Sequence, residues 1–129
     1  MGHYVAGEVI KLMLSKGIEL STAKVLILGF TFKENCPDVR NTKVIDLIRN
    51  LQEYGVDIEV WDPLADKYQV KSIYNLDINN KEPSSRYDAI VLAVGHIEFK
   101  MLDLQKNKKN KAVVYDVKGI LGNQADKRL

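Results

Sequence analysis

Three charged residues lie close together in one long polar stretch, where they could bind a phosphate group. The stretch runs from Gly29 to Asn41 and contains Lys33, Asp38 and Arg40. Lysine and arginine bind phosphate oxygens through charge-assisted hydrogen bonds, and the amino end of a following helix adds partial positive charge. Asp38 is spaced to hold one of the two cations. The same residues also fit a solvated surface loop with a weak ion pair between Asp38 and Arg40.

The other residues of this stretch bear on whether it binds a phosphate or is only a solvated surface loop. Phe30 and Phe32 favour a functional loop slightly, because a mobile solvated loop rarely needs two aromatic side chains. The stretch has neither the G-x-G-x-x-G pattern of dinucleotide sites nor the G-x-x-x-x-G-K-[ST] pattern of P-loops. We therefore expect phosphate contacts through side chains rather than conventional NAD binding by this loop.

Other reactive residue types lie outside the charged trio. Cys36 is the only cysteine, so neither an internal disulfide nor a paired-cysteine metal site is possible. It precedes Pro37 and has no histidine near it in sequence, so we interpret it as a structural residue and not a nucleophile. His96 follows an apolar run, where it could donate to a phosphate or ribose or serve as a buried structural side chain. Asp62, followed by Pro63, is expected to end a strand and cap the next helix.

Apolar runs predict the strands that must position these residues. Runs of this length without polar interruption are typical of strands buried on both faces of a parallel sheet. Such runs occupy residues 24–29 and 87–95, and strands are also expected over residues 57–61 and 112–116.

Helical spacing of apolar residues predicts helices between the strands. An opening helix is expected to end near Gly17, and a second one to run from Asn41 or Thr42 to Gly55. Weaker patterns predict a short helix over residues 64–68, an edge strand over 70–73 and a short helical face over 99–104.

This alternation predicts an α/β fold: a three-layer Rossmann-like domain with a mostly parallel sheet and right-handed crossovers, preceded by a helix. Ligands of such sheets bind beyond the carboxyl ends of the strands. The loops to consider therefore begin at Phe30, Asp62, Gly95 and Val117.

Composition limits the class of protein. The 129 residues carry a net charge of +2 and are 46% hydrophobic, which fits one domain with one core. Basic residues gather only in the run from Lys106 to Lys111, expected to form a solvated loop, so nucleic acid is not an expected partner. No apolar run approaches the ~20 residues that span a membrane, and with a lone cysteine we expect a cytoplasmic location.

The stretch from Lys24 to Asp62 closely resembles the start of the UDP-binding domain of the UDP-glucose and GDP-mannose dehydrogenase family. The signature F-K-x-x-x-x-D-x-R is present as Phe32, Lys33, Asp38 and Arg40. The form ENCPD followed by RNT is most similar to the branch that acts on UDP-N-acetylhexosamines. Further matches are VGH with EF over residues 94–99 and DVKGIL over residues 116–121.

The resemblance implies a role for each matching residue. Lys33 would contact the UDP-sugar, Phe32 would line its pocket and Asp38 would orient the loop. Arg40 would reach across the cleft towards NAD, which in this family is held mainly by an amino-terminal Rossmann domain. Lys118 is a weaker candidate for the same cleft, because only its DVKG neighbourhood matches.

The resemblance also implies how the chain divides into segments and to what kind of enzyme it belongs. Residues 1–20 resemble the end of the helix that leads from the family's central dimerisation region, and residues 21–129 the UDP-sugar-binding domain. The family oxidises the sugar C6 alcohol to a carboxylate with two NAD and a cysteine thiohemiacetal, usually for capsule or O-antigen synthesis. The cysteine's glycine-rich motif has no counterpart here. We therefore expect no catalytic residue in this chain, and as partners the amino-terminal and central domains and a second subunit of a homodimer.

Three other classes of protein share part of this pattern. A signalling receiver domain needs an acidic pair at the end of its first strand, where Gly29 and Phe30 stand. An assembly domain could pair through the helical stripe of Val5, Val9 and Leu12. A free-standing nucleotide-binding module is disfavoured because its first helix would have no cap.

Overall fold

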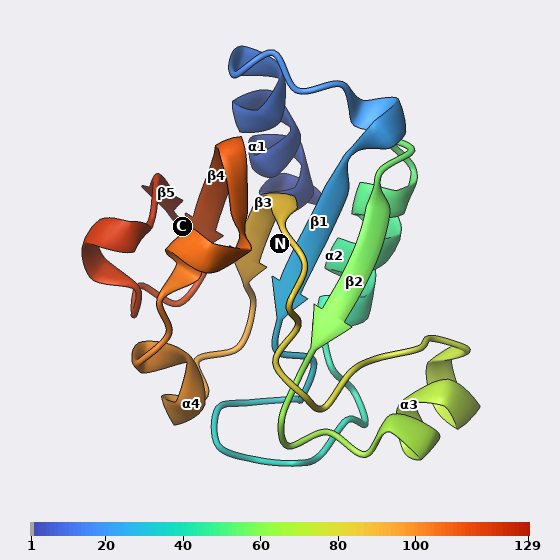
Figure 1. The fold of residues 1–129 in the computed structure, drawn as a ribbon. Helices are drawn as coiled ribbons and strands as arrows, with labels where there is room; N and C mark the ends of the chain where they lie inside the picture. The colour runs from blue at the N-terminus through green and yellow to red at the C-terminus, as the bar shows by residue number, and fades with distance from the viewer. Residues whose placement is uncertain (1) are drawn as a thin grey trace.

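The apolar runs form the middle of a five-stranded, all-parallel sheet with the order β2-β1-β3-β4-β5 (Figure 1). The computed structural model describes residues 2–129. Along β1, side chains alternate between two cores: Val25 and Ile27 face one, Leu26 and Leu28 the other. The strands are β1 (Lys24–Leu28), β2 (Asp57–Trp61), β3 (Tyr87–Leu92), β4 (Lys108–Asp116) and β5 (Lys127–Arg128).

Helices cover both faces of this sheet. On one face, α1 (Gly2–Ser15) and α2 (Val44–Gln52) pack against each other and against the sheet. On the other, α4 (Ile97–Lys100) and the short 3-10 helices at Leu104–Asn107 and Gly122–Gln124 close a smaller core around Trp61. The predicted α/β fold with a parallel sheet and a preceding helix is confirmed.

Helix α1 belongs to the core of this chain. Val5, Val9 and Met13 are each at most 1% exposed, and they pack in the same cluster as Leu47 and Ile48 of α2. The predicted helix is therefore confirmed, but its apolar stripe is already covered. Assembly through the Val5, Val9 and Leu12 stripe, one of the alternatives, is wrong because Val5 and Val9 are buried inside the chain.

The segment after β2 differs from the sequence prediction. A single helix, α3 (Lys67–Tyr74), replaces both the expected helix over 64–68 and the edge strand over 70–73. Asp66 caps it by accepting hydrogen bonds from the backbone N–H groups of Tyr68 and Gln69. Val70 and Tyr74, one helical turn apart, turn towards the core. Tyr68 and Ile73 of the same helix are exposed, so the apolar spacing of the sequence does not mark one buried face.

The lysine-rich run is also not the expected loop. Strand β4 begins at Lys108, which pairs with Tyr87 of β3, and the register shifts before the next pair, Val113 with Ala89. Lys109 forms an ion pair with Asp88 at 3.1 Å. The two-residue strand β5 was not predicted either; a hydrogen bond from Val114 N–H to the Asp126 carboxylate precedes it. No helix between Gly2 and Leu129 is long and apolar enough to cross a bilayer.

Candidate functional site

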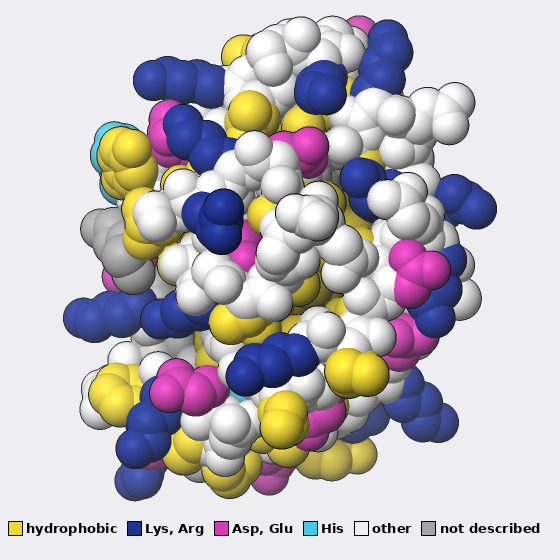
Figure 2. Space-filling model, turned by 90° about the vertical axis from the view of Figure 1, so that its left-hand side faces the viewer, with side chains coloured by type: hydrophobic (Ala, Val, Ile, Leu, Met, Phe, Trp, Pro, Cys, Tyr) yellow, Lys and Arg dark blue, Asp and Glu magenta, His cyan; other side chains and the backbone are white. Residues whose placement is uncertain are grey.

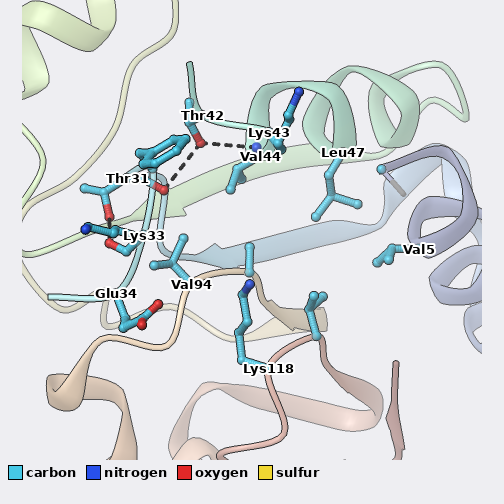
Figure 3. A pocket seen from close by; sticks show the side chains of 14 residues that line it. Val5, Thr31, Lys33, Glu34, Thr42, Lys43, Val44, Leu47, Val94 and Lys118 are labelled. Atoms are coloured by element: carbon cyan, nitrogen blue, oxygen red, sulfur yellow. Dashed lines mark hydrogen bonds between the residues drawn. The ribbon is translucent and has the colours of Figure 1, made fainter. Parts of the chain in front are cut away.

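A hollow of about 150 Å³ lies where the carboxyl ends of β1, β3 and β4 meet the amino end of α2 (Figure 3). Three of the predicted residues line it: Phe32, Lys33 and Lys118. Lys118 extends into it from the segment after β4, whereas Lys33 lies on the side formed by the loop after β1. The wall also includes apolar side chains, which are Val5, Val44, Leu47, Ala93, Val94 and Val117.

The loop after β1 is divided into two parts, the loop base (residues 29–35) and the loop arch (residues 36–41). The base starts at Gly29, whose φ of 97° is a conformation that suits glycine. A Cβ there would lie 2.6 Å from the Cβ of Val94, so the close approach of the two strand ends also requires glycine.

Asp62, at the end of β2, holds the loop base. One carboxylate oxygen accepts hydrogen bonds from the backbone N–H groups of Phe30 and Thr31, at 2.7 and 3.2 Å. The other accepts from Leu64 and Ala65. The expectation that Asp62 caps the next helix is wrong: it closes a turn and binds the neighbouring loop, and Asp66 caps α3 instead.

The charge state of Asp62 follows from its surroundings. Burial alone would raise the pKa of this carboxyl, but hydrogen bonds from the His96 ring and from the backbone of Phe30 and Leu64 lower it below its ordinary value. Asp62 is therefore a buried carboxylate whose charge is balanced by donors from three segments.

His96 is the buried structural side chain that the sequence left open as one of two possibilities. Its ring is 0% exposed and lies between Asp62 and Thr31, with Nε2 at 2.9 Å from the Asp62 carboxylate and 3.1 Å from the Thr31 hydroxyl. The backbone N–H of Asn35 donates to Nδ1 at 2.9 Å. Both ring nitrogens are engaged inside the protein and His96 is not part of the lining of the hollow, so the ring does not face it.

The loop arch lies outside the hollow. The backbone N–H of Phe32 donates to the carbonyl of Asp38 at 2.7 Å, and the hydroxyl of Tyr74 donates to the carbonyl of Val39 at 2.6 Å. Arg40 and Asp38 form an ion pair at 3.1 Å. The side-chain hydrogen bond between them lowers the pKa of Asp38 and raises that of Arg40.

The structure thus brings some predicted residues together and separates others. Phe32, Lys33 and Lys118 share the hollow, while Arg40, with 71% of its side chain exposed, faces a second hollow beside α2 and α3. Asp38 contacts Arg40 and not Lys33.

Several polar residues of the site were missed: Thr31, Glu34, Thr42 and Lys43 also line the hollow. Asn35, beside them, adopts a left-handed φ of 58° and donates its backbone N–H to the His96 ring. Asparagine tolerates this conformation better than most residues, so its presence was a weak signal.

Charge elsewhere on the surface is mixed. On the face shown in Figure 2, lysine and arginine side chains are scattered and interspersed with acidic ones instead of forming one stripe. Within residues 2–129, no three His, Cys, Asp or Glu side chains are grouped to hold a metal ion. Cys36 is half-buried and free.

Comparison with known proteins gives a consistent answer over most of the chain. The UDP binding domain of the UDP-glucose/GDP-mannose dehydrogenase family matches residues 26–123. A UDP-N-acetyl-D-glucosamine 6-dehydrogenase from Salmonella typhi is 45% identical over the whole chain, and one from Pseudomonas aeruginosa is 41% identical. The chain spans 31% and 32% of the lengths of these two relatives.

The fold is similar to that of solved structures. A UDP-D-ManNAc dehydrogenase from Pyrococcus horikoshii superposes with a TM-score of 0.75 at 18% identity, covering 98% of this chain and 30% of that structure. Sequence, fold and the F-K-x-x-x-x-D-x-R loop therefore agree. The chain belongs to the UDP-glucose/GDP-mannose dehydrogenase family and carries its UDP binding domain.

Proposed function

We propose that this chain is the UDP-sugar-binding domain of a larger NAD-dependent dehydrogenase, which oxidises the C6 alcohol of a UDP-N-acetylhexosamine to a uronic acid. The observation that carries the proposal is the hollow at the strand ends, where Lys33 and Lys118 meet an apolar wall. Two ammonium groups suit a diphosphate, and an apolar wall with an exposed aromatic ring, Phe32, suits a flat base or sugar face.

Each residue has its own part in this proposal. Lys33 binds a phosphate oxygen, Phe32 lines the sugar-nucleotide pocket and Lys118 adds a second positive charge. Asp38 orients the loop arch by holding Arg40. Arg40 faces away from the hollow, and we assign it to NAD that is bound mainly by a separate amino-terminal domain.

This chain offers NAD few contacts of its own. The loop base has no G-x-G-x-x-G pattern, but the exposed guanidinium of Arg40 is suited to one phosphate or ribose contact. NAD would supply the hydride acceptor, and no residue of this chain is assigned to the chemical step.

The same proposal assigns a place to this chain in the whole protein. Residues 1–20 are the end of a linking helix and residues 21–129 the binding domain, in a cytoplasmic homodimer. The relatives named as UDP-N-acetyl-D-glucosamine 6-dehydrogenases support the substrate class.

Calorimetric titration of this chain with UDP tests the proposal. We expect binding that Lys33→Ala weakens about 10- to 100-fold, because a hydrogen bond to a charged group is lost. Lys16→Ala, at the far end of α1, is the matched control and should bind like the wild type. If the wild type gives no heat with UDP, or Lys33→Ala binds unchanged, the assignment of Lys33 is wrong.

Kinetics of the full-length enzyme test Arg40. Arg40→Ala should raise the KM for NAD more than the KM for the UDP-sugar, because the guanidinium lies outside the hollow. The opposite order would place Arg40 on the sugar nucleotide.

A further inference from the structure

One buried imidazole contacts the chain on both sides of Lys33. On the amino-terminal side, Nε2 of His96 lies 3.1 Å from the hydroxyl of Thr31, which in turn donates to the carbonyl of Lys33 at 3.0 Å. On the carboxyl-terminal side, the N–H of Asn35 donates to Nδ1 at 2.9 Å. His96, in the segment after β3, therefore contacts both ends of a short segment of the loop after β1.

The hydrogen bonds define the state of the ring. Nδ1 accepts a hydrogen from a backbone amide, so it carries no proton, and the neutral ring must hold its proton on Nε2. That N–H points at the carboxylate of Asp62 and the hydroxyl of Thr31. The Thr31 hydroxyl is then free to donate to Lys33. One tautomer satisfies every contact.

The loop base also forms a hydrogen bond with the residue next to His96. The side-chain carbonyl oxygen of Asn35 accepts from the backbone N–H of Ile97 at 2.9 Å. The backbones on either side of the hollow are thereby joined twice, through the ring and through Asn35. Lys33 itself has an exposed side chain, so its direction depends on where this backbone is held.

We propose that His96 is a positioning residue that sets the place of Lys33 through Thr31 and Asn35, and so tunes affinity for the UDP diphosphate without touching it. This rests on the proposed function, in which Lys33 binds a phosphate oxygen. A side chain that is held in place before the ligand arrives loses less freedom on binding.

The competing explanation is that His96 only fills space beside Phe99, whose ring lies 5.4 Å away. The two explanations differ in what a substitution must preserve. His96→Phe fills the volume without polar atoms. His96→Asn places an amide oxygen near the position of Nδ1, and His96→Gln places an amide nitrogen near the position of Nε2.

The experiment measures two properties of this chain and its variants in parallel. Amide hydrogen exchange of Asn35, with nitrogen shifts of the imidazole, reports the loop base and the tautomer. Calorimetry with UDP reports affinity. Ile97→Ala is the matched control, because its side chain is 62% exposed and only its backbone joins the network. Thermal melts confirm that each variant is folded.

We expect His96→Phe to lose protection of the Asn35 amide and to raise the Kd for UDP about tenfold, a loss equal to one hydrogen bond of ordinary strength. His96→Asn should retain the Asn35 protection and lie closer to the wild type than His96→Phe does. The wild-type ring should show a protonated Nε2 and a bare Nδ1. Unchanged Asn35 exchange and UDP affinity in folded His96→Phe, or a proton on Nδ1, would overturn the proposal.

The two measurements, amide exchange and calorimetry, distinguish a failure of the positioning role of His96 from a failure of the phosphate role of Lys33. If UDP binds neither the wild type nor any variant, the phosphate role of Lys33 fails. The exchange data then still decide whether His96 holds the loop base. If UDP binds and Lys33→Ala abolishes it, while His96→Phe changes neither measurement, only the positioning role fails.

Discussion

The loop base and the loop arch belong to one continuous loop, but different interactions hold them. The base is fixed by buried polar groups, since Asp62 and His96 are both 0% exposed and bond its backbone directly. The arch is fixed by one buried apolar residue, Val39, and by polar contacts at the surface. Lys33 is therefore presented from a preorganised backbone, whereas the side chain of Arg40 has only an exposed ion pair and stays accessible.

The largest effect in this comparison is expected from Asp62→Asn. The amide cannot accept hydrogen bonds from Phe30, Thr31 and His96 with the strength of a carboxylate, so the free energy of unfolding should fall by about 2 to 4 kcal/mol at neutral pH. Chemical denaturation measures this.

The same variant has a predicted pH dependence. The pKa of Asp62 is lowered by folding. Its contribution to stability is therefore fully present above the unfolded pKa of about 3.9 and is lost as the pH falls through the lower folded value. Below about pH 4, Asp62→Asn should lose less stability per pH unit than the wild type. Equal slopes would show that Asp62 is not a carboxylate held by these donors.

Asp116→Asn is a matched control that separates a general loss of stability from a change in the loop base. Asp116 is also 0% exposed and accepts hydrogen bonds from three backbone N–H groups, but at the end of β4. Asp116→Asn should destabilise the chain without changing exchange of the Asn35 amide, whereas Asp62→Asn should change both.

A smaller effect is expected from Tyr74→Phe, which acts on the arch. It removes the hydroxyl that donates to the Val39 carbonyl and should lower stability by about 1 kcal/mol. Binding of UDP should be unchanged, because neither residue lines the hollow. A loss of UDP affinity would mean that the two parts of the loop move together.

The smallest effect is expected from Asp38→Ala. Its ion pair with Arg40 is exposed, so the thermal unfolding midpoint should not shift measurably. NMR relaxation of the Arg40 side chain should show greater motion. A clear drop in the midpoint would indicate that the surface of the arch is more rigid than this comparison implies.

Most of the sheet was predictable because its central strands are apolar runs buried on both faces. The first part of β4 was not, since Lys109 and Lys111 are exposed and lie where the register between β3 and β4 shifts, so no apolar run marks the strand there. Helix α3 was missed because its stop and start depend on Asp66 and Asn75 more than on a wide apolar stripe.

The candidate site, too, could be predicted from the sequence only in part. Its loop was recognised from local residues, since Lys33 and Arg40 stand in one short segment. The supports of that loop come from far along the chain, at Asp62 and His96. Which acceptor meets which backbone N–H depends on how three strand ends converge, and that information is not contained in local spacing.

The position of β1 has a consequence for how the chain is made. This strand pairs with β2 on one side and with β3 on the other. During synthesis, β2 emerges soon after β1, but the second edge of β1 stays open until residue 92 has left the ribosome. Open strand edges are where nascent chains associate wrongly. Throughout the interval between β2 and β3, one edge of β1 is therefore without its partner strand.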